Sequence, residues 1–256
     1  MVEFEIKDGV AIISEGTTVI EERAFEGCTG LTSVEIPSNV TEIKYSAFRG
    51  CTGLTSIKLP SKLKEIEAAA FEDCTGLTSI KFPSNVKRIG YYAFKGCTGL
   101  TSINIPSSVI WIGGSVFCGC PNITSITVDE RNAVYDSREG CNAIIESASN
   151  KLVAVCKATV IPSNVKSIGC SAFGGCAGLV SITIPASVES IEDYAFCACN
   201  DLESVTILSA KAYIGDDVFG DCPSLKEVNV PPGTIDYYRS FFDNTFDKSI
   251  IKENVM

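Results

Sequence analysis

One eight-residue phrase recurs along this chain at a fixed spacing. GCTGLTSI occurs at residues 50–57 and again at 96–103, with near copies at 27–34 and 73–80. Repeats of about 20 to 50 residues are typical of solenoids, in which each unit buries its apolar face only against its neighbours. Phenylalanine follows the same period of 23 residues, interrupted once, at Phe25, Phe48, Phe71, Phe94, Phe117, Phe173, Phe196 and Phe219.

Each unit reads L-T-S-I-x-I-P-S-x-V-x-x-I-x-x-x-A-F-x-x-C-T-G. Its first third alternates apolar and polar side chains, as in Val34, Glu35 and Ile36, which predicts a strand with its apolar side inward. Proline then ends the strand, because its nitrogen cannot donate to a ladder. The looser apolar spacing that follows, as in Val40 and Ile43, predicts a turn and a short helical segment.

The motif L-x-x-I-x-I-P-x-x-V-x-x-I-x-x-x-A-F-x-x-C resembles the BspA-like, or Treponema-type, leucine-rich repeat over residues 8 to about 232. The resemblance implies an α/β solenoid, a right-handed leucine-rich-repeat superhelix with a parallel concave sheet. It also implies a non-enzymatic, adhesin-like surface or secreted protein that binds host or matrix proteins. The chain departs from the motif at Asp129 and Leu208, where proline is expected, and at Val116 and Val218, where alanine is expected.

We expect a single leucine-rich-repeat domain over residues 1–256. A solenoid needs atypical units at both ends, because its core would otherwise be open there. FEIK and VAII predict a hairpin at the start, and the spacing of Ile235, Tyr238 and Phe242 predicts a short helix at the end. The expected parts are a cap with the first rung at 1–30, regular repeats at 31–122, two widened rungs with a hairpin at 123–178, regular repeats at 179–232, and a cap at 233–256.

The period breaks between Cys120 and Cys176, which are 56 positions apart, one period plus 33. Two apolar runs there, CNAII and LVAVC, flank ESASNK and predict a hairpin with its turn at 147–150. An uninterrupted register places Cys141 opposite Cys156, with Cα atoms about 4.5 to 5.5 Å apart. These two residues are therefore a candidate disulfide or thiol pair, oxidised only in an oxidising compartment.

The chain contains thirteen cysteines and no histidine. Without histidine, the usual general base near neutral pH and every nucleophile–histidine pair are absent. The cysteines at the repeated position predict a buried ladder of small apolar side chains, and the close pairs that begin at Cys118 and Cys197 are too distant to share a metal. We expect no catalytic residues, no metal site and no cofactor, with an unrecognised enzyme site as the alternative of another class.

Two sets of residues are candidates for binding. The first, the concave row, contains the outward positions of successive strands: Glu35, Lys58, Lys81, Asn104, Thr127, Thr183, Thr206 and Asn229. It has no aromatic or arginine anchor, although binding hot spots are usually built from Trp, Tyr and Arg. The alternative set is the edge aromatics, Tyr45, Tyr91, Tyr92, Trp111 and Tyr194.

The net charge of −10 disfavours nucleic acid and anionic lipid as partners, and no apolar run reaches the roughly 20 residues of a membrane helix. We expect a monomer that binds a protein partner, at the cell surface or outside the cell. The second hypothesis is a cytoplasmic protein–protein interaction module of the same fold, favoured by the abundant cysteines and the absence of a recognisable signal peptide.

Overall fold

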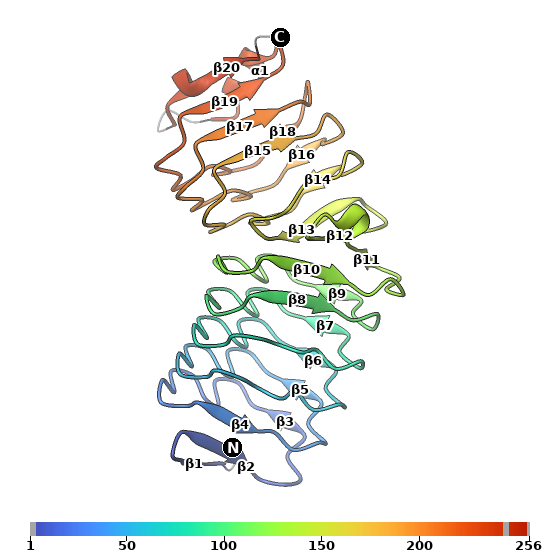
Figure 1. Ribbon diagram of the computed structural model, residues 1–256, viewed down its shortest axis with the longest axis vertical. Helices are drawn as coiled ribbons and strands as arrows, with labels where there is room; N and C mark the ends of the chain where they lie inside the picture. Colours follow the sequence, from blue (N-terminus) through green and yellow to red (C-terminus); the bar gives the residue numbers. More distant parts are fainter. Residues whose placement is uncertain (1–3, 243–245, 255–256) are drawn as a thin grey trace.

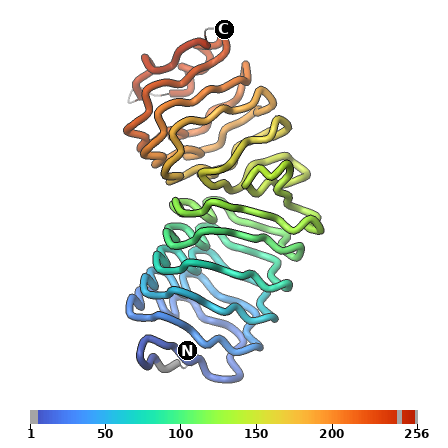
Figure 2. Tube along the Cα trace, viewed as in Figure 1, coloured from blue at the N-terminus to red at the C-terminus, as the bar shows by residue number. Residues whose placement is uncertain are grey.

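The computed structural model describes residues 4–242 and 246–254. The chain winds into a stack of coils, and its two ends lie at opposite ends of the stack (Figures 1 and 2). Each regular coil has three sides: one with the longer strands, one with two-residue strands, and one made of turns. We call these the long-strand side, the short-strand side and the turn side.

Both strand sides contain parallel ladders, and between regular coils each paired residue is joined to the residue one period further on. On the long-strand side, residues 56–59 and 79–82 form no strand. Thr183 pairs with Thr206 on the long-strand side, and Ile43 pairs with Ile66 on the short-strand side. The long-strand side comprises β2 (Val10–Ile13), β4 (Ser33–Glu35), β8 (Ser102–Ile105), β10 (Ser125–Val128), β15 (Ser181–Ile184), β17 (Ser204–Ile207) and β19 (Glu227–Val230). The short-strand side comprises β3 (Val19–Ile20), β5 (Glu42–Ile43), β6 (Glu65–Ile66), β7 (Arg88–Ile89), β9 (Trp111–Ile112), β14 (Ser167–Ile168), β16 (Ser190–Ile191) and β18 (Tyr213–Ile214).

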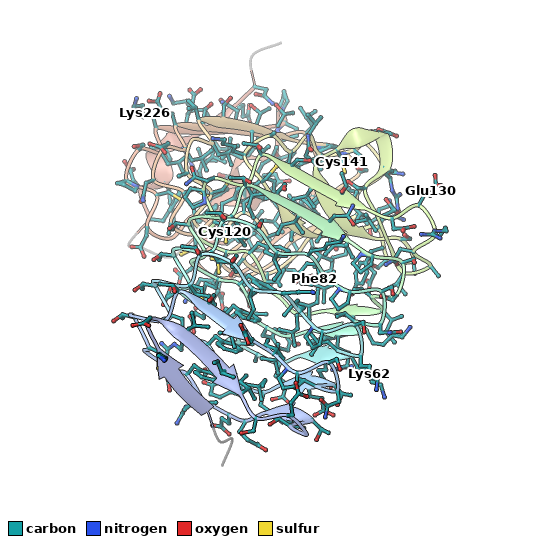
Figure 3. The ribbon with its side chains drawn as sticks, turned by 60° about the horizontal axis from the view of Figure 1, so that its bottom comes forward. Lys62, Phe82, Cys120, Glu130, Cys141 and Lys226 are labelled. Atoms are coloured by element: carbon teal, nitrogen blue, oxygen red, sulfur yellow. The ribbon has the colours of Figure 1, made fainter. Side chains whose placement is uncertain are left out.

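The phenylalanine ladder forms the interior of the turn side, as the sequence predicted. Phe25, Phe48, Phe71 and Phe94 have no exposed surface, and successive ring centroids are 5.0, 5.1 and 5.2 Å apart with nearly parallel planes. Charged side chains such as Lys62 lie at the periphery, whereas Cys120 lies inside the stack (Figure 3). Apolar side chains at matching positions therefore stack from coil to coil.

The repeated cysteines are more than apolar filler. Cys51 Sγ donates to the carbonyl oxygen of Phe25 at 3.0 Å, and Cys74 Sγ donates to that of Phe48 at 3.0 Å. The same bond recurs down the stack and gives a second donor to a carbonyl that already accepts from an amide of its own coil. Burial raises the pKa of Cys97 well above its usual value and that of Cys120 to about 12, so these thiols stay protonated at neutral pH.

The short helical segments that the sequence predicted in each coil are turns instead. Ala47 N donates within its own coil to Lys44 O, but Phe48 N donates to Ala70 O in the next coil. Because alternate amides bond to the neighbouring coil, the continuous i to i−4 pattern of an α-helix does not form. One α-helix occurs in the described part of the chain, α1 (Ile235–Arg239), and no helix there is long and apolar enough to cross a membrane.

The irregular segment widens the two strand sides and leaves the turn side closed. It adds β11 (Tyr135–Asp136), the 3-10 helix η1 (Arg138–Gly140), β12 (Ala143–Glu146) and β13 (Lys151–Val155), which separate the β3–β9 sheet from the later short strands. On the turn side, Gly119 N donates directly to Gly174 O at 3.0 Å. The buried core divides at the hairpin into two clusters, one on either face of it.

The expected opposition of Cys141 and Cys156 is wrong. The hairpin pairs Glu146 with Lys151 as expected, but a bulge shifts the register between Ile144 and Ile145 and brings Val155 opposite Ala143. Cys156 then packs in the N-terminal core cluster and Cys141 in the C-terminal one, and both thiols are free.

Both ends of the stack are closed by atypical elements. β1 (Phe4–Lys7) forms the expected antiparallel hairpin with β2. At the other end, α1 buries Tyr238, whose hydroxyl donates to Ser209 O at 2.6 Å and accepts from Ala212 N at 3.1 Å. The 3-10 helix η2 (Lys248–Ile250) leads into β20 (Ile251–Glu253), which the sequence did not predict and which pairs in parallel with β19.

Candidate functional site

The concave row lies on the outer face of the long-strand side, but it is not continuous. Asn104 pairs with Thr127 and donates to its hydroxyl at 3.0 Å, and Thr183, Thr206 and Asn229 pair in a second sheet. Each residue of the row is exposed or half-buried. The widened segment separates these two sheets. Glu35 lies in a third sheet, β1–β2–β4, and Lys58 and Lys81 lie in no strand, so the row is interrupted in more than one place.

Two of the edge aromatics come together on the short-strand side. The rings of Tyr91 and Trp111 meet edge to face with centroids 5.3 Å apart, and the guanidinium of Arg88 lies 4.4 Å from the centroid of the Trp111 ring. Tyr45 and Tyr92 are exposed and each lies near a single cation. We call Arg88, Tyr91 and Trp111 the junction patch.

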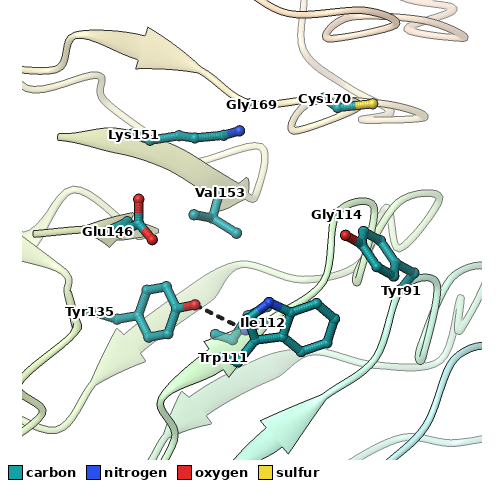
Figure 4. Close-up of a pocket in the computed structure, with 10 residues that line it drawn as sticks. All are labelled: Tyr91, Trp111, Ile112, Gly114, Tyr135, Glu146, Lys151, Val153, Gly169 and Cys170. Atoms are coloured by element: carbon teal, nitrogen blue, oxygen red, sulfur yellow. Dashed lines mark hydrogen bonds between the residues drawn. The ribbon is translucent and has the colours of Figure 1, made fainter. Parts of the chain in front are cut away.

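The junction patch borders a cavity of about 320 Å³ where the short-strand side is interrupted. Figure 4 shows Tyr91 and Trp111 on one side of it, Tyr135 beside them, and Lys151 and Cys170 across from them. The cavity exists because β9 ends its sheet. The residues that line it are Tyr91, Trp111, Ile112, Gly114, Tyr135, Glu146, Lys151, Val153, Gly169 and Cys170.

Tyr135 takes the place of the missing strand next to β9. Its hydroxyl accepts a hydrogen bond from Ile112 N at 2.9 Å, which satisfies a buried edge amide that would otherwise have no partner. Burial raises the pKa of Tyr135 above its usual value, so the hydroxyl stays neutral. The floor of the cavity is thus fixed by the fold and does not need a ligand to form.

Two cations at or near the cavity, Lys151 and Arg88, are paired with carboxylates. Lys151 Nζ lies 2.7 Å from a carboxylate oxygen of Glu192, which also accepts from Cys170 N at 3.1 Å. Arg88 bonds to Glu65 one coil away at 3.1 Å. The guanidinium is therefore held against the indole ring by a fixed partner, and the patch combines Trp, Tyr and Arg, the residue types that dominate binding hot spots.

The described residues contain no group of three or more Cys, Asp or Glu side chains that could hold a metal ion. Burial raises the pKa of Cys118 and of Cys197, so neither is an activated thiolate. Around the cavity we find no arrangement of nucleophile, base and oxyanion donors.

Sequence reasoning found Tyr91 and Trp111 but missed Arg88 and Tyr135. Arg88 lies one period before Trp111, so a comparison of outward positions in the two-residue strands would have placed it beside the ring. Tyr135 belongs to the irregular segment, where the period gives no neighbour. Tyr194, in the C-terminal half, belongs to a different hollow, which it shares with Phe241 and Phe242.

Comparisons with known proteins agree with this architecture. The BspA type leucine rich repeat region matches residues 11–138 and 147–255, with six copies. No curated protein matches the chain in sequence. A leucine-rich repeat protein from Eubacterium ventriosum superposes with a TM-score of 0.77 at 24% identity, covering 91% of this chain and 70% of that one.

Two further solved structures are similar. A leucine rich cell surface protein from Faecalibacterium prausnitzii has a TM-score of 0.67 and 29% identity, over 85% of this chain and 65% of that one. A leucine-rich repeat protein from Bacteroides ovatus has a TM-score of 0.58 and 26% identity, over 90% of this chain and 69% of that one.

Proposed function

Since this chain belongs to the BspA-type leucine-rich repeat family, we propose that it is a non-enzymatic recognition scaffold, adhesin-like, displayed at a bacterial cell surface or secreted. Its partner is a protein of the host or of the extracellular matrix. The solved relative from Faecalibacterium prausnitzii is described as a cell surface protein, which supports this location.

The observation that carries the proposal is the junction patch and the cavity that it borders. Insertions into a repeat often map to its binding face. This one leaves the indole of Trp111 and the phenol of Tyr91 at the edge of a hollow of about 320 Å³, with the guanidinium of Arg88 against the indole. A partner side chain that enters the hollow would contact Trp111 and exclude water from it. The concave row offers mainly hydroxyl and amide groups, which contribute less to affinity.

Attachment of cells that display the chain tests the proposal. A non-adherent bacterial strain carries the full chain on its outer surface, and cells are counted after washing on wells coated with extracellular-matrix proteins and on epithelial monolayers. Trp111→Ala should reduce attachment by at least about tenfold, because truncating a hot-spot residue costs about 2 kcal/mol or more.

Tyr45→Ala is the matched control for Tyr91→Ala. Tyr45 and Tyr91 stand two periods apart at the same repeat position, and Tyr45 also lies near a cation, with Arg23 5.5 Å from its ring. Tyr45 does not line the cavity. Tyr91→Ala should weaken attachment while Tyr45→Ala should not; equal attachment by Trp111→Ala and wild type would refute the assignment of the site.

The thirteen free thiols favour a second candidate, a cytoplasmic interaction module of the same fold, because reducing compartments preserve free cysteine. Thiol titration of the protein isolated from its native cells under non-reducing conditions separates the two. Accessible thiols that are fully reduced support the cytoplasmic module, and oxidised ones support an exported protein.

A further inference from the structure

On the long-strand side, two consecutive regular coils differ from the other regular coils. Among the residues that the structure describes, segments 56–59 and 79–82 form no strand ladder, either with each other or with β4 and β8 on either side. Their backbone amides and carbonyls are therefore left without the partners that the same positions have elsewhere. Unpaired backbone groups of this kind are uncommon where a chain is packed.

A groove lies over these two segments. Its volume is about 650 Å³, and its apolar lining includes Ile57, Leu59 and Phe82. These three side chains are 9%, 7% and 7% exposed, whereas Ile103 and Ile105, at the corresponding positions of the coil that follows, are 2% and 0% exposed. The apolar surface of the core thus reaches the outside here and not in the coil beyond.

Lys58 and Lys81 stand at the mouth of the groove, one period apart, and both are exposed. Neither lysine forms an ion pair with any residue of the described chain, including Glu35 in the preceding coil. Three further lysines of the same two coils also form no ion pair in the described chain: Lys62, Lys64 and Lys87. Like charges at neighbouring positions on adjacent coils destabilise each other.

Other cations, including Arg88 and Lys95 elsewhere in the same two coils, commonly face a carboxylate one coil away. Lys44 lies 2.9 Å from Glu67, and Lys95 lies 3.1 Å from Glu72. Lys166 and Glu189, and Lys226 and Glu203, repeat the pattern in the C-terminal half. In a chain with a net charge of −10, five lysines without ion partners in two coils mark a local region that attracts negative charge.

We propose that this groove binds an extended, acidic segment of a partner protein, with carboxylates on Lys58 and Lys81 and an aliphatic side chain between them against Leu59 and Phe82. An extended segment presents alternate side chains to the same face, so carboxylate and aliphatic residues at suitable positions can meet both features of the groove. A charged contact to a carboxylate is about twice as strong as a neutral one.

The inference rests on the proposed function in that the partner is a protein, but it concerns a surface separate from the junction patch. The probe is a fluorescent short peptide of alternating aspartate and leucine, with two comparison peptides. One replaces aspartate by asparagine, and the other replaces leucine by serine. Fluorescence anisotropy with the full chain measures each affinity at low and high salt.

The variant K58Q/K81Q should weaken binding of the aspartate–leucine peptide by at least about tenfold, from the loss of two charge-assisted contacts. The matched control is K157Q/K211Q, which makes the same change in net charge at two exposed lysines that also lack ion partners and lie outside the groove. Both comparison peptides should bind more weakly than the probe, and high salt should weaken the probe.

No binding of the probe, or equal loss in the two double variants, would overturn the proposal. A single-stranded oligonucleotide that displaces the peptide and binds more tightly would assign the groove to nucleic acid instead and would also overturn it. Attachment is also measured for cells that display K58Q/K81Q, so that a failure of this inference can be distinguished from a failure of the proposed function. If Trp111→Ala abolishes attachment and the peptide does not bind, the groove inference alone fails.

Discussion

Replacing Phe94 by alanine tests the packing on which every other inference depends. Phe94 has no exposed surface and contacts Phe71 and Phe117 with ring centroids 5.2 and 5.8 Å away, and Phe82 edge to face at 5.6 Å. Such substitutions in cores cost about 3 to 5 kcal/mol, and aromatic pairs contribute about 0.5 to 1.5 kcal/mol beyond area.

The neighbouring coils cannot readily close the space left by the ring. Phe94 N donates to Val116 O at 3.0 Å, and Phe71 N donates to Ala93 O at 2.8 Å, so the coils on both sides are held at their spacing by backbone bonds. Because the cost of a deletion rises with the cavity that remains, we expect a loss of about 4 kcal/mol in the free energy of unfolding.

Urea unfolding followed by far-UV circular dichroism and by Trp111 fluorescence measures this loss. At a urea dependence of about 3 kcal/mol per molar, the midpoint should fall by roughly 1.3 M. Ile110→Ala is the control, because Ile110 is 55% exposed and should change stability by less than about 0.5 kcal/mol. A loss below about 1 kcal/mol for Phe94→Ala would refute the buried ladder.

Three further predictions follow from particular contacts. Ala198 has φ +58°, at the repeat position where Gly119 and Gly175 have φ +70° and +66°. A positive φ strains alanine but not glycine, so Ala198→Gly should raise the free energy of unfolding by about 0.5 to 1 kcal/mol in urea titration. A decrease in that free energy would contradict this reasoning. Tyr238→Phe leaves the buried Ala212 amide without its acceptor and should cost about 1 to 3 kcal/mol by the same titration; an unchanged midpoint would contradict that role. Burial raises the pKa of Cys120 from 9.0 to about 12, so the folded state holds this proton more tightly than the unfolded state does. The free energy of unfolding should therefore fall as pH rises from 9 toward 12. Cys120→Ala should make this fall with pH less steep, and an unchanged pH dependence would contradict the burial effect.

The stacked core could be predicted from the sequence because the same apolar residue types recur at the same positions of each repeat. Phe48 and Cys51 recur at one spacing, and matching positions in a solenoid must lie next to each other. The turns that replace the expected helical segments could not be inferred in this way, since the apolar spacing around Ala47 is compatible with a turn and with a short helix. Backbone bonds to the next coil, which sequence does not show, decide between them.

The irregular segment shows where prediction from sequence ended. Its hairpin and turn were predictable from alternating runs around a polar link, but the bulge between Ile144 and Ile145 was not. That bulge depends on packing two core clusters against opposite faces of one hairpin. Trp111 was predictable as an exposed aromatic, whereas its contact with Arg88 and the hollow beside it follow only from the end of the sheet at β9.

Deleting residues 129–161, the 33 residues beyond one period, tests the central claim most directly. The deletion joins Val128 to Pro162 and restores the spacing of 23 between Cys120 and Cys176. We predict a folded solenoid by circular dichroism and urea unfolding that no longer attaches when displayed on cells, because the junction cavity is gone. A variant that fails to fold would contradict the equivalence of the coils, and a folded variant that attaches like wild type would contradict recognition at the interruption.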